Sequence, residues 1–123
     1  MILKNELRIG SYISIKNENG IFNLPVFEMC EDWVNVKDEK GGIWAIWYEE
    51  MEPIPLTKEI FLKSGFRKAD DWFCDDLYGL MFQCKDRGYS LEWGEYSIVT
   101  VYTVHQLQNV YFALNGNDLD VKF

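Results

Sequence analysis

Residues 97–117 read SIVTVYTVHQLQNVYFALNGN and decide how the second half of the chain folds. They contain no Asp, Glu, Lys or Arg, although 26% of the whole chain is charged, which would place about five such residues there. The first part is rich in Ile, Val, Thr and Tyr, which predicts a buried strand over residues 96–102. The second part predicts a helix over residues 104–114, because Thr103 and Gln106 have the spacing of a capping box.

The predicted helix has two different faces. At 100° per residue its apolar positions form one stripe, which we expect to belong to the core: Val104, Leu107, Val110, Tyr111 and Leu114. A second face, roughly opposite, carries His105, Gln108, Asn109 and Phe112. Helix faces in contact with water normally carry Lys and Glu. We therefore expect this uncharged face to be covered, either by the rest of the fold or by a partner.

Residues 54–123 predict an α+β subdomain. A rigid Pro-Ile-Pro connector begins it, and Thr57 can cap a short helix over residues 57–64. Glycines then divide residues 71–102 into short segments with strand composition. These features predict an antiparallel β-meander between the short helix and the C-terminal helix.

Residues 1–53 predict a small β subdomain. About four short strands with turn residues between them suggest a small SH3-like antiparallel β-barrel or a curled sheet. Pro25 interrupts one strand and suits an edge or a bulge, since proline cannot donate to a ladder. The fold class is therefore α+β, with the 1–53 and 54–123 subdomains forming one compact unit.

Composition bounds the function classes. The chain has 123 residues, of which 48% are apolar and 16% aromatic, enough for the core of one domain or of two very small subdomains. A formal net charge of -8 argues against non-specific nucleic-acid binding and against an anionic membrane surface. No apolar run reaches the length of a membrane span, and the start MILKNELRIG lacks the apolar segment of a secretory signal.

The cysteines give no sign of a disulfide framework or of a metal site. Cys30, Cys74 and Cys84 are odd in number and form no Cys-x-x-Cys pair. We interpret them as reduced, mostly buried thiols of a cytoplasmic protein. Nothing in the sequence calls for a cofactor.

Three blocks of the chain resemble a known family. They are ELRIGSYI at residues 6–13, EPIPLTKEIFLKSGF at residues 52–66 and VHQLQNVYFAL at residues 104–114. The same blocks in the same order mark an uncharacterised family of small proteins from gut anaerobes and their phages and mobile elements. The resemblance implies a cytoplasmic protein associated with a phage or mobile element. It implies no activity and supplies no catalytic residues.

Candidate chemistry is sparse. His105 is the only histidine, and in the first turn of a helix the dipole would lower its pKa and keep the ring neutral. It could act as a base or simply tie the helix start to a neighbouring strand. A Cys–His pair would need Cys74 or Cys84 beside it. Adjacent carboxylates such as Asp75 and Asp76 point to opposite faces of a strand, so they would not converge.

Tryptophans offer a second candidate surface. Trp44 and Trp47 are three positions apart, so on one strand they face opposite sides and at least one can be exposed. An exposed tryptophan would suit a peptide, a sugar or a partner protein.

Three functional hypotheses follow. The leading one is a non-enzymatic protein-binding or assembly module that docks on a protein partner or on itself through His105, Gln108, Asn109 and Phe112, with Trp44 and Trp47 as further contacts. The second is an acidic inhibitor or DNA mimic of a host nucleic-acid enzyme, which needs its carboxylates gathered on one surface. The third is a small enzyme centred on His105.

Overall fold

The computed structural model describes residue 2 and residues 4–123, which divide into two compact units. Unit 1 comprises Met1–Ile54 and Val104–Asn109, and unit 2 comprises Pro55–Thr103 and Val110–Phe123. The C-terminal helix α2 (Val104–Asn115) is therefore shared, because its first six residues belong to unit 1 and the rest to unit 2. The sequence placed the whole of this helix with residues 54–123.

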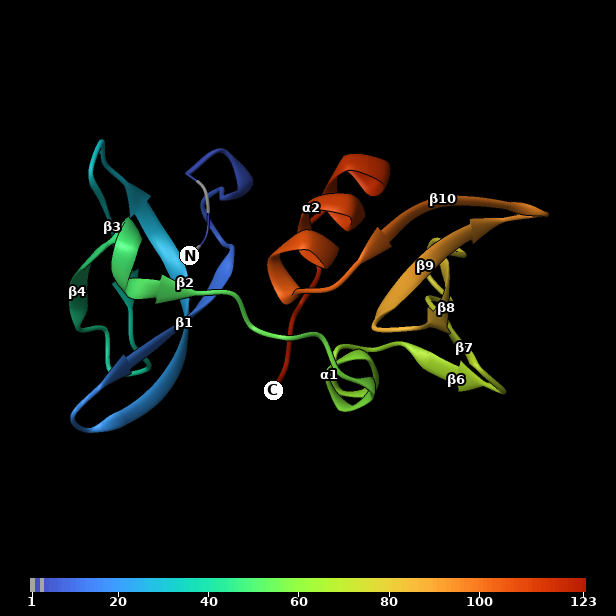
Figure 1. Ribbon diagram of the computed structural model, residues 1–123, viewed down its shortest axis with the longest axis horizontal. Coiled ribbons are helices and arrows are strands. Elements are labelled where there is room, and N and C mark those ends of the chain that lie inside the picture. Colours follow the sequence, from blue (N-terminus) through green and yellow to red (C-terminus); the bar gives the residue numbers. More distant parts are fainter. Residues whose placement is uncertain (1, 3) are drawn as a thin grey trace. The chain divides into compact units, whose positions relative to one another are not determined.

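Unit 1 is a curled antiparallel sheet of five strands in the order β4-β3-β2-β1-β5 (Figure 1). Its elements are η1 (Lys4–Glu6), β1 (Tyr12–Asn17), β2 (Gly20–Met29), β3 (Trp33–Lys37), β4 (Ile43–Trp47), η2 (Tyr48–Glu50) and β5 (Met51–Glu52). The expected small barrel or curled sheet is thus present as a curled sheet.

The long strand β2 produces the curl. Its first part pairs with β1, where Pro25 lies opposite Tyr12, and its last part pairs with β3. Phe27 is the extra residue of a bulge between the paired positions Val26 and Glu28. A bulge bends a strand and increases its twist, so β2 turns where its hydrogen-bonded neighbour changes.

Alternation along the strands builds the core of unit 1. Parts of β1, β2 and β3 alternate so that every second residue is buried: Ile13 and Ile15, Leu24 and Val26, and Val34 and Val36. The most completely buried of these are Ile13, Val26, Val34 and Val36, together with Met51 of β5.

Unit 2 contains a second antiparallel sheet of five strands, in the order β10-β9-β8-β7-β6. Its strands are β6 (Arg67–Ala69), β7 (Trp72–Cys74), β8 (Met81–Lys85), β9 (Gly88–Trp93) and β10 (Tyr96–Val101), and helix α1 (Lys58–Lys63) precedes them. Thr57 caps α1 as predicted, because its hydroxyl oxygen accepts a hydrogen bond from the Ile60 amide at 3.2 Å. Gly116 ends α2 with φ +73° and donates to the Phe112 carbonyl.

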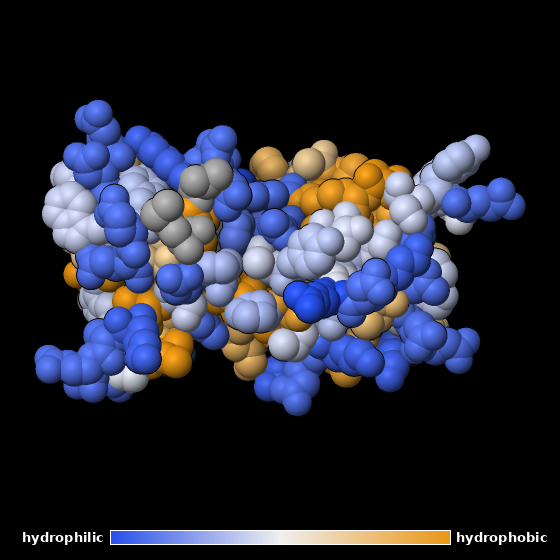
Figure 2. Space-filling model, viewed as in Figure 1, coloured by the Kyte–Doolittle hydropathy of each residue, from blue (hydrophilic) through white to orange (hydrophobic). Residues whose placement is uncertain are grey.

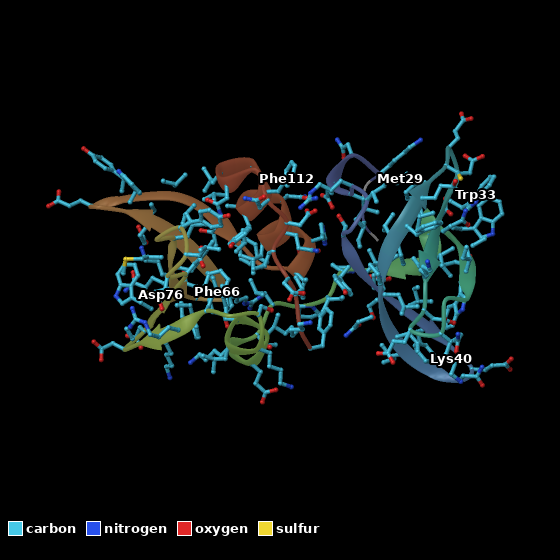
Figure 3. The ribbon with its side chains drawn as sticks, turned by 180° about the vertical axis from the view of Figure 1, so that it is seen from behind. Met29, Trp33, Lys40, Phe66, Asp76 and Phe112 are labelled. Carbon is cyan, nitrogen blue, oxygen red and sulfur yellow. The ribbon has the colours of Figure 1, made fainter. Side chains whose placement is uncertain are left out.

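Aromatic packing forms the core of unit 2. Phe61 of α1 is fully buried and its ring lies 4.8 Å from both Phe73 and Tyr89, centroid to centroid. Phe66 meets the same ring edge-on at 5.0 Å and, in the other direction, Tyr111 of α2 at 6.4 Å (Figure 3). Phe61 therefore joins the short helix to the sheet.

Two expectations about burial are wrong. Strand β10 was expected to be buried, but it is the end strand of its sheet and only Val101 of it is buried. Leu114 was assigned to the core stripe of α2 and is 53% exposed. Of the other stripe positions, Val104, Leu107 and Tyr111 are buried and Val110 is half-buried.

Replacing Phe61 with Ala should destabilise the protein by about 3–5 kcal/mol, since it removes a buried ring and leaves a cavity. Urea unfolding followed by circular dichroism measures this. Phe27→Ala is the control, because Phe27 is 45% exposed and loses chiefly its cation–π contact with Lys37, worth about 1 kcal/mol or less. Equal losses for the two variants would contradict the central role of Phe61.

Candidate functional site

The uncharged face of α2 is used inside unit 1. The Gln108 side chain is buried, and its carbonyl oxygen accepts a 2.8 Å hydrogen bond from the Tyr12 amide. Its amide nitrogen donates to the Gly10 carbonyl at 2.9 Å. One carboxamide thus satisfies a donor and an acceptor of the backbone that leads into β1. A Lys or Glu could supply only one of these two functions.

Asn109 and Arg8 continue the same contact. The Asn109 amide nitrogen donates to the Glu6 carbonyl at 2.8 Å, and its oxygen accepts from Arg8 Nε at 3.2 Å. A terminal guanidinium nitrogen of Arg8 also donates to the backbone carbonyl of Gln108 at 3.1 Å. Together with the two hydrogen bonds of the Gln108 side chain, these contacts hold the segment from η1 to β1 against the helix.

His105 lies at the same contact and is only 2% exposed. Its Nε2 is 3.5 Å from Oε2 of Glu6. Burial lowers the pKa of His105 below 6.5, and the neighbouring Glu6 carboxylate opposes this shift only in part. The ring is neutral near pH 7 and is enclosed by protein.

These contacts account for the missing charges without a partner. Three of the four residues on the predicted interaction face, His105, Gln108 and Asn109, are engaged with unit 1's own N-terminal segment. The fourth, Phe112, projects from the half of α2 that belongs to unit 2 and is 42% exposed (Figure 3). Only the C-terminal half of the helix therefore offers exposed apolar surface.

The two candidate tryptophans differ in exposure and in the contacts that they make. Trp44 is half-buried, donates from its indole nitrogen to Asp38 at 3.1 Å and packs edge-on against Phe22. It lines a hollow of about 460 Å³ in unit 1 together with Asp38 and Phe22. Trp47 is 52% exposed and meets Trp33 edge-on at 5.7 Å. The Asp38 carboxylate also accepts from the Gly42 amide, so it is occupied by its own loop.

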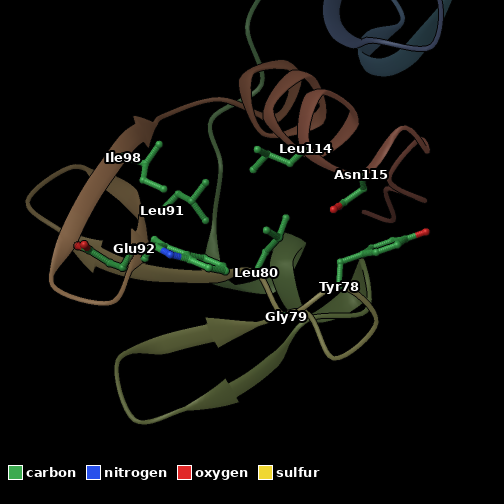
Figure 4. Close-up of a pocket in the computed structure, with 9 residues that line it drawn as sticks. Tyr78, Gly79, Leu80, Leu91, Glu92, Ile98, Leu114 and Asn115 are labelled. Atoms are coloured by element: carbon green, nitrogen blue, oxygen red, sulfur yellow. The ribbon is translucent and has the colours of Figure 1, made fainter.

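A more apolar hollow lies in unit 2, between the β9–β10 hairpin and the end of α2. It measures about 440 Å³. The side chains of Leu80, Leu91, Ile98 and Leu114 converge on it, and Tyr78 borders it on the other side (Figure 4). The space-filling view shows apolar residues gathered over the C-terminal half of α2 and the adjoining part of β10 (Figure 2).

Strand register explains why apolar side chains meet there. Leu91 and Trp93 are two apart on β9, so they share one face, and their partners Val99 and Tyr96 on β10 share it with them. Ile98 is the extra residue of a bulge, so it lies opposite Leu91 beside Val99. The bulge thus adds the apolar side chain of Ile98 to the face of the sheet whose central part is buried in the core of unit 2.

The side chains at this end of the sheet are largely uncovered. Trp93 is 71% exposed, Tyr96 75%, Ile98 57% and Leu114 53%. We call the surface formed by Trp93, Tyr96, Ile98, Val99 and Leu114 the hairpin surface. The sequence does not single out these residues, because a strand of this composition is more often buried.

The opposite face of the same strands is polar and internally paired. Lys85 Nζ lies 2.6 Å from Glu92, and the Ser97 hydroxyl donates to the same carboxylate at 2.9 Å. Lys85 and Ser97 together lower the pKa of Glu92. This face is polar but only partly solvated, because Ser90 is 1% exposed and the Glu92 side chain 8%, whereas the hairpin surface is apolar and exposed.

The remaining sequence candidates are engaged locally. Asp75 is buried and accepts hydrogen bonds from the amides of Leu77 and Tyr78, and Asp76 pairs with Arg67 at 3.1 Å. The three cysteines are free thiols. Within the described part of the chain, no group of three or more His, Cys, Asp or Glu side chains is placed to hold a metal ion. Neither α-helix among the described residues combines the length and apolar character needed to cross a bilayer.

Comparison of the chain with models of protein families, with curated proteins and with solved structures found no match in any of the three.

Gln108→Glu should destabilise the protein by about 2 kcal/mol or more, because a carboxylate has no N–H for the Gly10 carbonyl and would be a buried charge. Urea unfolding at neutral pH measures the loss. Asn23→Asp on β2 is the control, because Asn23 is exposed, and it should change stability by less than about 0.5 kcal/mol. Equal effects would show that the two hydrogen bonds of Gln108 carry little stability.

Stability should fall as the pH is lowered below about 6.5, through His105. The folded state holds this ring with a lowered pKa, so the unfolded chain binds the proton more readily, and the stabilisation present at higher pH is lost on acidification. Urea unfolding between about pH 7 and pH 5 measures the slope for wild type and His105→Gln. Glu6 faces the ring and is unchanged in both proteins. An identical slope in the two would refute the lowered pKa.

Proposed function

We propose that this chain is a non-enzymatic protein-binding or assembly module, and that it binds through the hairpin surface of unit 2. The observation that carries the proposal is an apolar pocket of about 440 Å³ bordered by an uncharged, exposed end strand. Contiguous exposed apolar surface of this kind is typical of interaction sites. We therefore place the binding surface at the end of α2 and on β10, and not at the start of α2 as the sequence suggested.

The composition of the surface fits the core of an interface. Trp93 and Tyr96 are the residue types that contribute most to binding energy, because each supplies a large contact area with few rotatable bonds. On β9 and β10 the single charged residue is Glu92, which borders the pocket and is neutralised by its ion pair with Lys85 of β8. Depletion of charge with aromatic enrichment is the pattern of an interface core.

The other two hypotheses receive less support from the geometry. An acidic mimic needs carboxylates gathered on one surface, but in the acidic segment of residues 70–76 Asp75 is buried and Asp76 already pairs with Arg67. An enzyme centred on His105 needs the ring to reach a substrate, and the ring is 2% exposed. The resemblance of the sequence blocks makes a phage or mobile-element origin and a cytoplasmic location part of the same proposal.

A photo-crosslinking residue tests the binding surface. With p-benzoylphenylalanine in place of Tyr96, irradiation of expressing cells should give discrete polypeptide adducts, resolved on denaturing gels and assigned by mass spectrometry. The matched control carries the same residue in place of Ile9, which is 63% exposed in unit 1. Discrete adducts from position 96 alone are expected. Absence of any polypeptide adduct from position 96, or the same adducts from both positions, would overturn the proposal.

A further inference from the structure

We propose that the partner at the hairpin surface is a second copy of this chain, bound about a twofold axis; this inference rests on the proposed function. A twofold interface requires a surface that is complementary to itself, because each residue of one copy meets the equivalent surface of the other. The hairpin surface carries both a hollow and the side chains that could fill one.

The protruding and the receiving parts lie on one face of the same two strands. Trp93 and Tyr96 are cross-strand partners and project furthest, with exposed fractions of 71% and 75%. The adjoining pocket of about 440 Å³ is lined by Leu80, Leu91 and Leu114, and Trp93 forms part of its wall. In the proposed dimer, a twofold rotation would bring Tyr96 of each copy to the pocket of the other, so that both copies bury the same groups.

Charge permits this contact although each copy carries a net charge of -8. On β9 and β10 the single charged residue is Glu92, which borders the pocket and is paired with Lys85, and Glu95 is exposed in the turn between Trp93 and Tyr96. Repulsion between the two copies, including that between their Glu95 carboxylates, is screened by salt. A basic partner would behave oppositely, since its attraction to this acidic chain would weaken as salt is added.

The available area matches a reversible dimer. The exposed parts of the two aromatic side chains and of Ile98, Val99 and Leu114 amount to roughly 500 Å² per copy, if a large aromatic side chain presents about 200 Å². Two copies would bury about 1,000 Å², which is the lower limit for a specific interface. Interfaces near this lower limit are typically weak and transient, so we expect a dimer that dissociates on dilution.

The contact is assigned to the face of the sheet rather than to its edge. Strand β10 is the end strand and could in principle pair with another strand. The bulge at Ile98 interrupts its regular ladder in the middle of the strand, and bulges of this kind obstruct edge-to-edge pairing. Side-chain packing on the Trp93 face does not depend on an unbroken ladder.

Sedimentation velocity of the full chain over a concentration series that spans the micromolar range tests the inference. Wild type should shift from monomer to dimer, with more dimer at higher salt. Ile98→Glu and Trp93→Ala should each weaken dimerisation at least tenfold. Ile43→Glu is the matched control, because Ile43 is also 57% exposed and lies on β4, the end strand of the sheet in unit 1. It should dimerise like wild type.

The outcomes separate this inference from the proposed function. A wild-type chain that stays monomeric throughout, while position 96 cross-links a different polypeptide, overturns self-association and leaves the binding module standing. A monomer with no adduct at position 96 refutes both. A dimer that both Ile98→Glu and Ile43→Glu weaken equally, or that neither weakens, contradicts the assigned surface. Circular dichroism and the urea midpoint of each variant exclude unfolding as the cause.

Discussion

The carboxamide of Gln108 is the contact on which unit 1 depends. It bonds to the backbone on both sides of Ser11, at Gly10 and Tyr12, where the chain enters the strand that pairs with both β2 and β5. Fixing the start of β1 fixes the registers of the strands on either side, because a shift of one residue would turn every inward side chain outward. The same two bonds explain why the helix carries amides rather than charges at this place.

Unit 2 is organised around a different constraint, the burial of one face of a five-stranded sheet. Phe61 and its aromatic neighbours cover the centre of that face, and Tyr111 of α2 extends the cover through Phe66. The β9–β10 hairpin extends beyond these residues with the same alternation of apolar side chains. At its end the apolar side chains are exposed, because these aromatic residues do not pack over them. The bulge places Ile98 on this face as well, so it increases the exposed apolar area.

Local signals in the sequence were sufficient for the fold class and for the two main helices. Thr57 and Gly116 act within a few residues of themselves, so their roles can be read from the sequence alone. Strands as short as Met51–Glu52 and Arg67–Ala69 carry too few residues for a periodicity. The roles of His105, Gln108 and Asn109 depend on residues about a hundred positions away, and no local pattern reports such a partner. Exposure of β10 was also hidden, because a buried strand and an exposed apolar strand can have the same composition.

The interleaving of the two units has a consequence for biosynthesis. Domains ordinarily fold in the order in which the ribosome releases them, beginning with the N-terminal one. Here the N-terminal unit waits for residues 104–109, which are translated after every strand of the second sheet. A nascent or prematurely terminated chain that ends before Gln108 leaves the backbone around Gly10 and Tyr12 without its amide partner. Completion of the first unit therefore requires that every strand of the second sheet has already been translated.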